Sequence, residues 1–180
     1  MRCFIAVDLE QSLTKKIQQL QNQLKGLDVK LVEQNNLHFT LKFLDEIQES
    51  AVNDVKEKLE ELASSTQAFS INLHGVGVFP SEKYIRVIWV GAENREFADL
   101  HNAVNNALDK MFKKEKSSPH LTIARVRPGC DDHKIAEFLE RHKNTEIGSM
   151  IVDKLRLKKS ILMESGPIYE DIATFELVKN

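Results

Sequence analysis

Two segments of the chain carry the same pair of residues capable of acid–base chemistry. One is LHFTLKF (residues 37–43), which contains His38 and Thr40, and the other is PHLTIAR (residues 119–125), which contains His120 and Thr122. Each follows the order His-apolar-Thr-apolar, and the copies lie 82 residues apart. A single His-x-Thr in a strand is common and usually structural. Two matched copies on otherwise apolar strands indicate a functional site, because burying these polar groups without a purpose is costly.

The residue types suit the opening of a cyclic phosphodiester. In-line attack by water needs one group that takes a proton from the water and another that protonates the departing ribose oxygen on the opposite side of phosphorus. Two histidines can do both, because imidazole titrates near neutral pH. Threonine hydroxyls can donate hydrogen bonds to the non-bridging oxygens. Since a cyclic phosphate is strained, a metal is not obligatory, and we expect neither a metal nor a cofactor.

Both segments must be strands for these side chains to converge. Polar and apolar residues alternate in segment 37–43, and side chains at positions i and i+2 project from the same face of a strand. His38 and Thr40 therefore point one way while Phe39 points into the core, and His120 and Thr122 repeat the arrangement. The internal similarity indicates an old duplication, with two similar lobes related by an approximate two-fold axis.

Strands and helices alternate along the rest of the chain and are joined by short loops. Apolar, β-branched runs predict strands at residues 2–9, 37–43, 69–79, 84–91, 120–126, 150–163 and 168–178. Apolar residues at helical spacing predict helices at residues 11–25, 50–63, 97–112 and 135–141, the second with Ser50 as its N-cap. No linker is long enough to separate independent domains, so we expect one domain over residues 1–180.

Composition narrows the class of protein. The chain has 180 residues, of which 42% are hydrophobic, enough to form a real interior. The net charge of −2 argues against a protein that coats duplex DNA, so a nucleic-acid substrate would have to be bound locally. Two distant cysteines, Cys3 and Cys130, do not suggest a disulfide framework, and the N-terminus resembles a strand rather than a signal peptide. We expect a cytoplasmic protein with no membrane segment that acts as a monomer.

The paired motifs resemble those of the 2H phosphoesterase superfamily, and most closely those of the RNA 2′,3′-cyclic phosphodiesterases, also called 2′-5′ RNA ligases. The resemblance covers nearly the whole chain. Besides the two motifs, it includes RCFIA (residues 2–6), TLKFL (residues 40–44), GVGVFP (residues 75–80) and RVIWVG (residues 86–91). The motif positions show no departure from the family's pattern.

The resemblance implies an α+β fold with two antiparallel sheets lining a central cleft and helices on the outside. It also implies hydrolysis of an RNA 2′,3′-cyclic phosphate end to a 2′-phosphomonoester, with His38 as proton donor and His120 as proton acceptor. Members of the family can also join RNA ends through a 2′-5′ linkage. Arg125 is implied as a phosphate-binding residue beside Thr40 and Thr122. In a regular strand Arg125 would lie on the face opposite His120, so a bulge must bring it inward.

Other residues and other functions stay open at this point. Lys42 is expected on the face of His38, where it could extend the site. Phe4, Phe79 or Tyr84 could stack on a base, although a core role is favoured for both phenylalanines. The alternatives to an RNA end-processing enzyme are a phosphodiesterase of small cyclic nucleotides, a non-catalytic module that binds RNA ends, and a metal hydrolase. No Asp, Glu or His cluster with ligand spacing supports the last.

Overall fold

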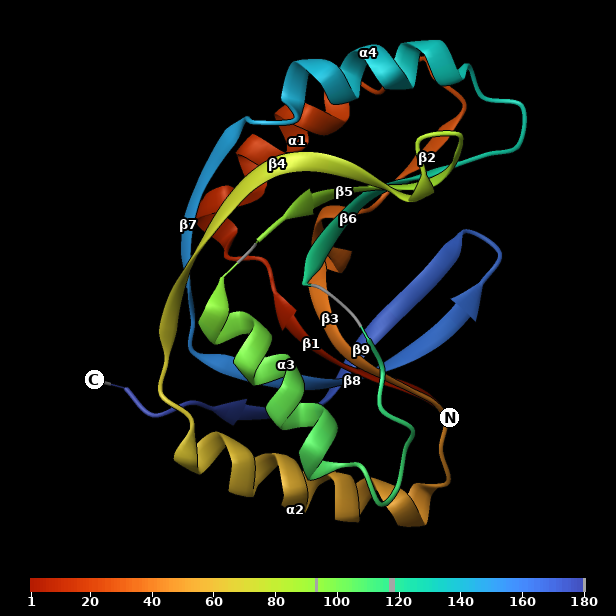
Figure 1. Cartoon of the computed structure of the whole chain (residues 1–180). Coiled ribbons are helices and arrows are strands. Elements are labelled where there is room, and N and C mark those ends of the chain that lie inside the picture. The colour runs from red at the N-terminus through yellow and green to blue at the C-terminus, as the bar shows by residue number, and fades with distance from the viewer. Residues whose placement is uncertain (93, 117–118, 180) are drawn as a thin grey trace.

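The computed structural model describes residues 1–92, 94–116 and 119–179. In this part of the chain nine strands and four α-helices are present (Figure 1). The strands are β1 (Arg2–Asp8), β2 (Val29–Leu31), β3 (His38–Glu46), β4 (Phe69–Ser81), β5 (Tyr84–Gly91), β6 (His120–Val126), β7 (Glu146–Val152), β8 (Lys154–Met163) and β9 (Gly166–Glu176). The helices are α1 (Thr14–Asn22), α2 (Glu49–Ser65), α3 (Arg95–Ala107) and α4 (Asp132–His142).

The strands form one sheet whose middle is the pair that carries the histidine motifs. Its order is β7-β4-β5-β6-β3-β1-β8-β9, with β2 beside β6, and all the pairs between these strands are antiparallel. The α+β class is therefore confirmed. The two expected sheets are continuous, because β3 and β6 are joined through the single residue pair Phe39–Leu121.

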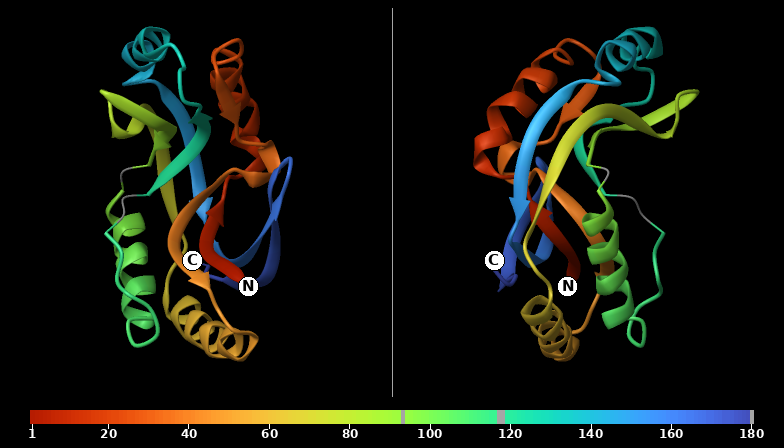
Figure 2. Two further views of the ribbon diagram at one scale, coloured as in Figure 1. Left: turned by 90° about the vertical axis from the view of Figure 1, so that its right-hand side faces the viewer. Right: turned by 60° about the vertical axis from the view of Figure 1, so that its left-hand side comes forward.

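The two lobes are not the two halves of the sequence, because each lobe takes elements from both halves. The lobe that contains β3 also contains β1, β8 and β9, and α2 and α3 pack on it. The lobe that contains β6 also contains β2, β4, β5 and β7, and α1 and α4 pack on it. The two pairs of helices consequently lie at opposite ends of the molecule, with β3 and β6 between them (Figure 1, Figure 2).

The helices follow the predicted periodicity, with corrections at their ends. In α2 the buried residues recur at Val52, Val55, Leu59 and Ala63, as expected for one face of a helix. The prediction of Ser50 as N-cap is wrong, because α2 begins at Glu49, after Gln48. The helix expected at 97–112 spans Arg95–Ala107 and is capped by Asn94, whose side chain accepts a hydrogen bond from the backbone N–H of Phe97.

The structure differs from the expected elements in three further places. The helix expected at residues 11–25 is shorter, since a 3-10 turn (Gln11–Leu13) precedes α1. The strand expected at residues 150–163 is two strands, β7 and β8, which are separated at Asp153 and pair with different neighbours. The three-residue β2 was not predicted. None of the described helices is long and apolar enough to cross a membrane.

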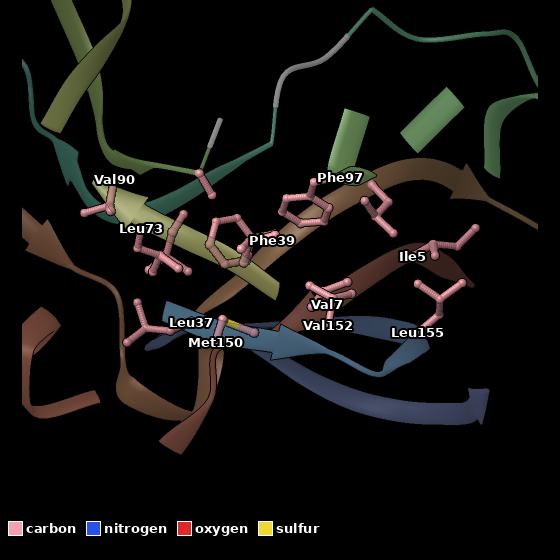
Figure 3. Packing of buried hydrophobic residues seen from close by; sticks show 14 of the residues in the cluster. Ile5, Val7, Leu37, Phe39, Leu73, Val90, Phe97, Met150, Val152 and Leu155 are labelled. Carbon is pink, nitrogen blue, oxygen red and sulfur yellow. The ribbon is translucent and has the colours of Figure 1, made fainter. Parts of the chain in front are cut away.

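The hydrophobic core packs against the face of β3 and β6 that carries Phe39 and Leu121 (Figure 3). Phe39 of β3 is fully buried there, and its ring meets the ring of Phe97 from α3 edge-on at a centroid distance of 5.3 Å. Leu121 occupies the equivalent position in β6 and is also fully buried. Because alternate strand residues point to opposite faces, anchoring Phe39 and Leu121 in the core directs the motif histidines and threonines away from it.

Candidate active site

The two motifs meet on one face of the central strand pair. Extending the antiparallel register by one residue on either side of Phe39–Leu121 sets His38 opposite Thr122 and Thr40 opposite His120. All four of these side chains are half-buried, whereas the residues between them are buried. The two histidines are diagonal neighbours in this register, a relation that separates strand positions by about 7–8 Å. The four motif side chains therefore share one face of the strand pair.

Local hydrogen bonds fix the orientation of the His38 ring. Its Nδ1 lies 2.7 Å from the carbonyl oxygen of Asn36, in the 3-10 turn that precedes β3. Since a carbonyl oxygen can only accept, Nδ1 carries the proton. Nε2 lies 3.1 Å from Oγ1 of Thr40 and, in the neutral ring, accepts from that hydroxyl. Nε2 is therefore the nitrogen available to exchange a proton with a substrate.

The protein environment favours neutral His38. Burial is the main cause and lowers the pKa of His38 from 6.5 to about 4. The Asn36 carbonyl and the negative charge of Asp8 act in the opposite direction, while the positive charges of Lys158 and Arg125 lower the pKa further. A bound phosphodiester anion would add a negative charge beside the ring and raise this pKa.

The lowered pKa of His38 predicts a loss of stability in mild acid. Between pH 6.5 and about 4 the unfolded chain binds a proton at this ring and the folded protein does not, so the free energy of unfolding falls as the pH drops. We expect urea denaturation to show a decrease between pH 7 and pH 4.5 that is smaller by about 2 kcal/mol in His38→Gln than in the wild type. His133→Gln, at an exposed histidine, is the control. Equal decreases in His38→Gln and the wild type would contradict the prediction.

His120 has an environment that mirrors that of His38. It is the first residue of β6 and pairs with Gly91 of β5. Its ring meets Phe79 edge-on at a centroid distance of 4.8 Å, and Phe4 lies 4.9 Å from the His38 ring. Each histidine thus packs against one phenylalanine. Phe4 is buried, as expected, while Phe79 is half-buried.

A glycine makes room for a second aromatic residue beside His120. The centroid of Trp89 lies 6.3 Å from that of the His120 ring. A Cβ at Gly77, on the neighbouring strand β4, would come within 2.2 Å of the Trp89 ring, so a side chain there would displace the indole. Gly77, the second glycine of GVGVFP, therefore leaves the space that the indole of Trp89 occupies. Tyr84 is 59% exposed and lies where the β4–β5 hairpin turns, where Nη1 of Arg86 donates to its hydroxyl.

A β-bulge brings Arg125 onto the face of His120 and Thr122. Thr122 pairs with Trp89, but Ala124 pairs with Ile88, so Ile123 is the extra residue on β6. Ile123 and Ala124 are both buried, and Arg125 emerges on the same side as Thr122. The charge of Arg125 acts on His38 and on Tyr169, which places it near the other lobe's half of the site.

A matching bulge in β3 overturns the expectation for Lys42. Thr40 pairs with Ala6 and Lys42 with Ile5, so Leu41 is the extra residue. Lys42 is therefore on the core side and is fully buried. Its Nζ donates to Oδ1 of Asn105 (2.9 Å) and to the carbonyl oxygen of Lys113 (2.6 Å). Lys42 does not extend the site, and Phe43 takes the position that corresponds to Arg125.

Sequence reasoning missed a group of charged residues next to His38. Asp8 pairs directly with His38 across β1 and β3. Oδ2 of Asp8 is 2.9 Å from Nε of Arg156, and Oδ1 is 3.0 Å from Nζ of Lys158. Both cations also pair with Asp171 of β9. Burial by itself would raise the pKa of Asp171, but Lys158 and Arg156 outweigh this and hold that pKa below its usual value.

Only the pairing of β1 with β8 and of β8 with β9 could have revealed this charged group, and no local signal in the sequence gives the pairing of β1 with β8. Within this group Lys158 is only 5% exposed. In the described ranges no group of three or more His, Cys, Asp and Glu side chains is arranged to hold a metal ion. The site therefore offers imidazoles, hydroxyls, a guanidinium and aromatic walls.

Comparison with known proteins places this arrangement in context. The model of the LigT-like phosphoesterase family matches residues 7–89 and 90–169. The RNA 2′,3′-cyclic phosphodiesterase of Methanothermobacter thermautotrophicus is 40% identical over 98% of this chain and 99% of its own length. The protein of the same name from Methanocaldococcus jannaschii is 38% identical over 96% of this chain and 98% of its own.

Solved structures of other proteins share the fold of this chain. TT0787 of Thermus thermophilus superimposes with a TM-score of 0.86 and 26% identity, covering 98% of each chain. Escherichia coli LigT complexed with 3′-AMP superimposes with a TM-score of 0.74 and 20% identity, covering 98% of this chain and 97% of its own. The bilobal arrangement around the two central strands is thus a recurring fold.

Proposed function

The chain belongs to the LigT-like phosphoesterase family, and from this premise we propose that it hydrolyses RNA 2′,3′-cyclic phosphate ends with His38 and His120 as an acid–base pair. The observation that carries the proposal is the register of β3 and β6, which sets two imidazoles diagonally across one face with a threonine opposite each. The relatives at 38–40% identity are named for this activity. The chain is therefore an RNA 2′,3′-cyclic phosphodiesterase.

The proposed reaction is an in-line displacement at phosphorus. His120 takes a proton from water as the water oxygen bonds to phosphorus, and His38 gives a proton to the 3′ oxygen as the bond from that oxygen to phosphorus breaks. The product carries a 2′-phosphomonoester and a free 3′ hydroxyl. Nε2 of His38 suits this role, because Nδ1 is held by Asn36. His38 and His120 come from different lobes, which supports their placement on opposite sides of the phosphorus.

The low pKa of His38 has a consequence for this assignment. As proton donor His38 must be protonated when substrate is bound, and the negative charge of the diester favours that state. The positions of the limbs in a pH–rate profile do not distinguish the donor from the acceptor, because the pair titrates as a unit. A change of leaving group makes the distinction, because only the donor's role depends on the basicity of the departing atom.

Thr40, Thr122 and Arg125 complete the proposed site as ligands of the non-bridging oxygens. The threonine hydroxyls are donors on the same face as the histidines, and the guanidinium of Arg125 supplies a fixed positive charge for the phosphate. Phe4 packs against the ring of His38, and Phe79 and Trp89 pack against the ring of His120. The same site could accept a ribose 5′ hydroxyl in place of water, which would give the 2′-5′ linkage.

The proposed site is complete within one chain. Both motifs, Arg125 and the aromatic walls come from the same polypeptide, which supports action as a monomer in a single bilobal domain. Cys3 and Cys130 are both free thiols. Free thiols are typical of a reducing compartment, which supports a cytoplasmic location.

The decisive experiment identifies the product. An RNA ending in a 2′,3′-cyclic phosphate is incubated with the protein in excess EDTA, and the ribose oxygen that retains the phosphate is determined by NMR. We expect metal-independent conversion to the 2′-phosphate. His133→Ala, at an exposed histidine outside the site, is the control and should match the wild type. Formation of the 3′-phosphate, or no cleavage of the ring, would overturn the proposal.

A further inference from the structure

The hairpin of β8 and β9 brings a further aromatic ring to His38 that the acid–base mechanism does not use. The ring of Tyr169 meets the His38 ring edge-on at a centroid distance of 5.2 Å. It also meets Phe4 edge-on at 4.9 Å, and Phe4 in turn lies 4.9 Å from the His38 ring. These distances are in the range that interacting aromatic pairs prefer. The three rings therefore form one cluster, in which two aromatic side chains contact the imidazole.

The order of the strands does not by itself bring Tyr169 to His38. β9 is three strands away from β3 in the sheet, and Tyr169 pairs with Ser160 of β8. Neighbouring strands are about 4.8 Å apart, so a flat sheet would hold Tyr169 about 14 Å from β3. The hairpin must therefore curl toward β3, and this curled position needs contacts that maintain it.

Two side chains from outside the hairpin supply such contacts. Nδ2 of Asn36 donates to the carbonyl oxygen of Pro167 (3.1 Å), two residues before Tyr169. Lys30, in β2 of the other lobe, donates from Nζ to the carbonyl oxygen of Ser165 (2.7 Å) in the turn of the hairpin. The hairpin is thus held by residues of both lobes.

Asn36 connects the hairpin to the orientation of the His38 ring. Its backbone carbonyl oxygen lies 2.7 Å from Nδ1 of His38, while its side chain holds Pro167. A displacement of the hairpin would therefore act on His38 in two ways, through the contact with Tyr169 and through Asn36. An imidazole that is fixed both at Nδ1 and by neighbouring rings presents Nε2 in one direction.

We propose that Tyr169 is a positioning residue for His38, that Asn36 holds it in place, and that the ring of Tyr169 rather than its hydroxyl has this role. The inference rests on the proposed function, because it assigns Tyr169 to the orientation of the proposed proton donor. The contacts of Tyr169 with His38 and Phe4 are made by its ring. Orientation matters because misplacing a reacting group by about 1 Å can cost about 100-fold in rate.

The burial of His38 provides a second readout besides turnover. Burial is the main cause of the lowered pKa of His38, and the rings that contact it occupy space that water would otherwise fill. The charged groups around His38 are Asp8 of β1, Arg125 of β6, Arg156 and Lys158 of β8, and Asp171 of β9. All of them are kept when Tyr169 is replaced. Removing the ring of Tyr169 should therefore admit water and raise the pKa of His38 from about 4 toward 6.5.

The test measures turnover and the pKa of His38 in the same variants. Turnover is measured on an RNA that ends in a 2′,3′-cyclic phosphate, at the optimum pH of each variant. The pKa is measured by NMR titration, with the His38 signal identified by its absence in His38→Gln. We expect Tyr169→Ala to lower kcat by about 5- to 100-fold with little change in KM and to raise the pKa of His38. Tyr169→Phe keeps the ring and should match the wild type in both. Tyr84→Ala, at the other tyrosine of the chain, is the control.

Asn36→Ala tests how the hairpin is held. This substitution removes the donor to Pro167 and keeps the backbone carbonyl that binds Nδ1 of His38. We expect the same two changes as in Tyr169→Ala but smaller ones, because Lys30 still holds the turn of the hairpin. Wild-type values of kcat and of the His38 pKa in Asn36→Ala would contradict the role given to Asn36.

Thermal unfolding separates positioning from support of the fold. A Tyr169→Ala protein that is less stable but keeps the wild-type kcat and His38 pKa overturns the inference. An equal loss of kcat in Tyr169→Phe and Tyr169→Ala also overturns it, because the effect would then belong to the hydroxyl. Tyr169→Leu, which leaves a smaller cavity, takes the place of Tyr169→Ala if that variant does not fold. If the wild type does not open the cyclic phosphate, the proposed function fails, and the titration still decides whether Tyr169 sets the environment of His38.

Discussion

Replacing either motif histidine with alanine is expected to lower kcat/KM for a 2′,3′-cyclic phosphate end by about 10²- to 10⁴-fold with the fold retained. Each imidazole is assigned one proton transfer that no neighbour can perform. His38 and His120 are half-buried on the open side of β3 and β6, so their removal leaves the core residues Phe39 and Leu121 in place. The rate is measured on purified variants, with circular dichroism as the check of folding.

The double variant tests whether the two rings act as a unit. Catalytic groups that act together are strongly non-additive, so His38→Ala combined with His120→Ala is expected to lose much less than the product of the two single losses. The control is a histidine outside the site, and buried His101 is unsuitable because it contacts Asn105. Exposed His133 is the suitable position. A single variant that retains wild-type kcat/KM would remove that histidine from the mechanism.

A sulfur leaving group assigns the proton donor. When the 3′ oxygen of the cyclic phosphate is replaced with sulfur, the thiolate departs without protonation, because the pKa of a thiol is far below that of an alcohol. The variant that lacks the donor should then recover most of its activity, while the variant that lacks the acceptor should not. We expect recovery in His38→Ala. Recovery in His120→Ala instead would exchange the two roles and retain the pair.

Removing a threonine hydroxyl is expected to lower kcat by up to about 10²- to 10³-fold at each position. Thr40→Val and Thr122→Val keep the shape of the side chain and remove the hydroxyl proposed to donate to the phosphate oxygens. Thr40→Val also removes the partner that lies 3.1 Å from Nε2 of His38, so its pH–rate profile should shift as well. The profile of Thr122→Val provides the comparison.

Serine variants separate the hydroxyl from the methyl group. Thr40→Ser and Thr122→Ser keep the donor and are expected to stay within about ten-fold of the wild type. Affinity for a 2′-phosphomonoester product, measured by calorimetry, should follow the same order. If the valine variants turn over as fast as the wild type, the threonines do not hold the phosphate, and Arg125 must be tested for that role.

The two motif strands and their chemistry follow from local sequence. Alternation of polar and apolar residues is a property of a few consecutive positions, and it places His38 with Thr40 and His120 with Thr122 without knowledge of the partner strand. The strands that carry both motifs and the helix around Val55 were predicted on this basis. The duplication and the family resemblance also required nothing beyond the sequence.

The tertiary structure decided which residues join the histidines. Whether Lys42 or Phe43 shares the face of Thr40 depends on a bulge, and a bulge is set by the register against β1, not by the residues of β3 themselves. The same holds for Arg125 against β5. Asp8 meets Lys158 because β1 pairs with β8, strands that are distant in sequence and brought together by the burial of a shared core. Side-chain periodicity is local, whereas strand pairing and register are set by packing over the whole chain. Phe43, Asp8 and Lys158 could therefore be identified as neighbours of the motif residues only from the fold, whereas Arg125 was expected from the family resemblance and the fold supplied its bulge.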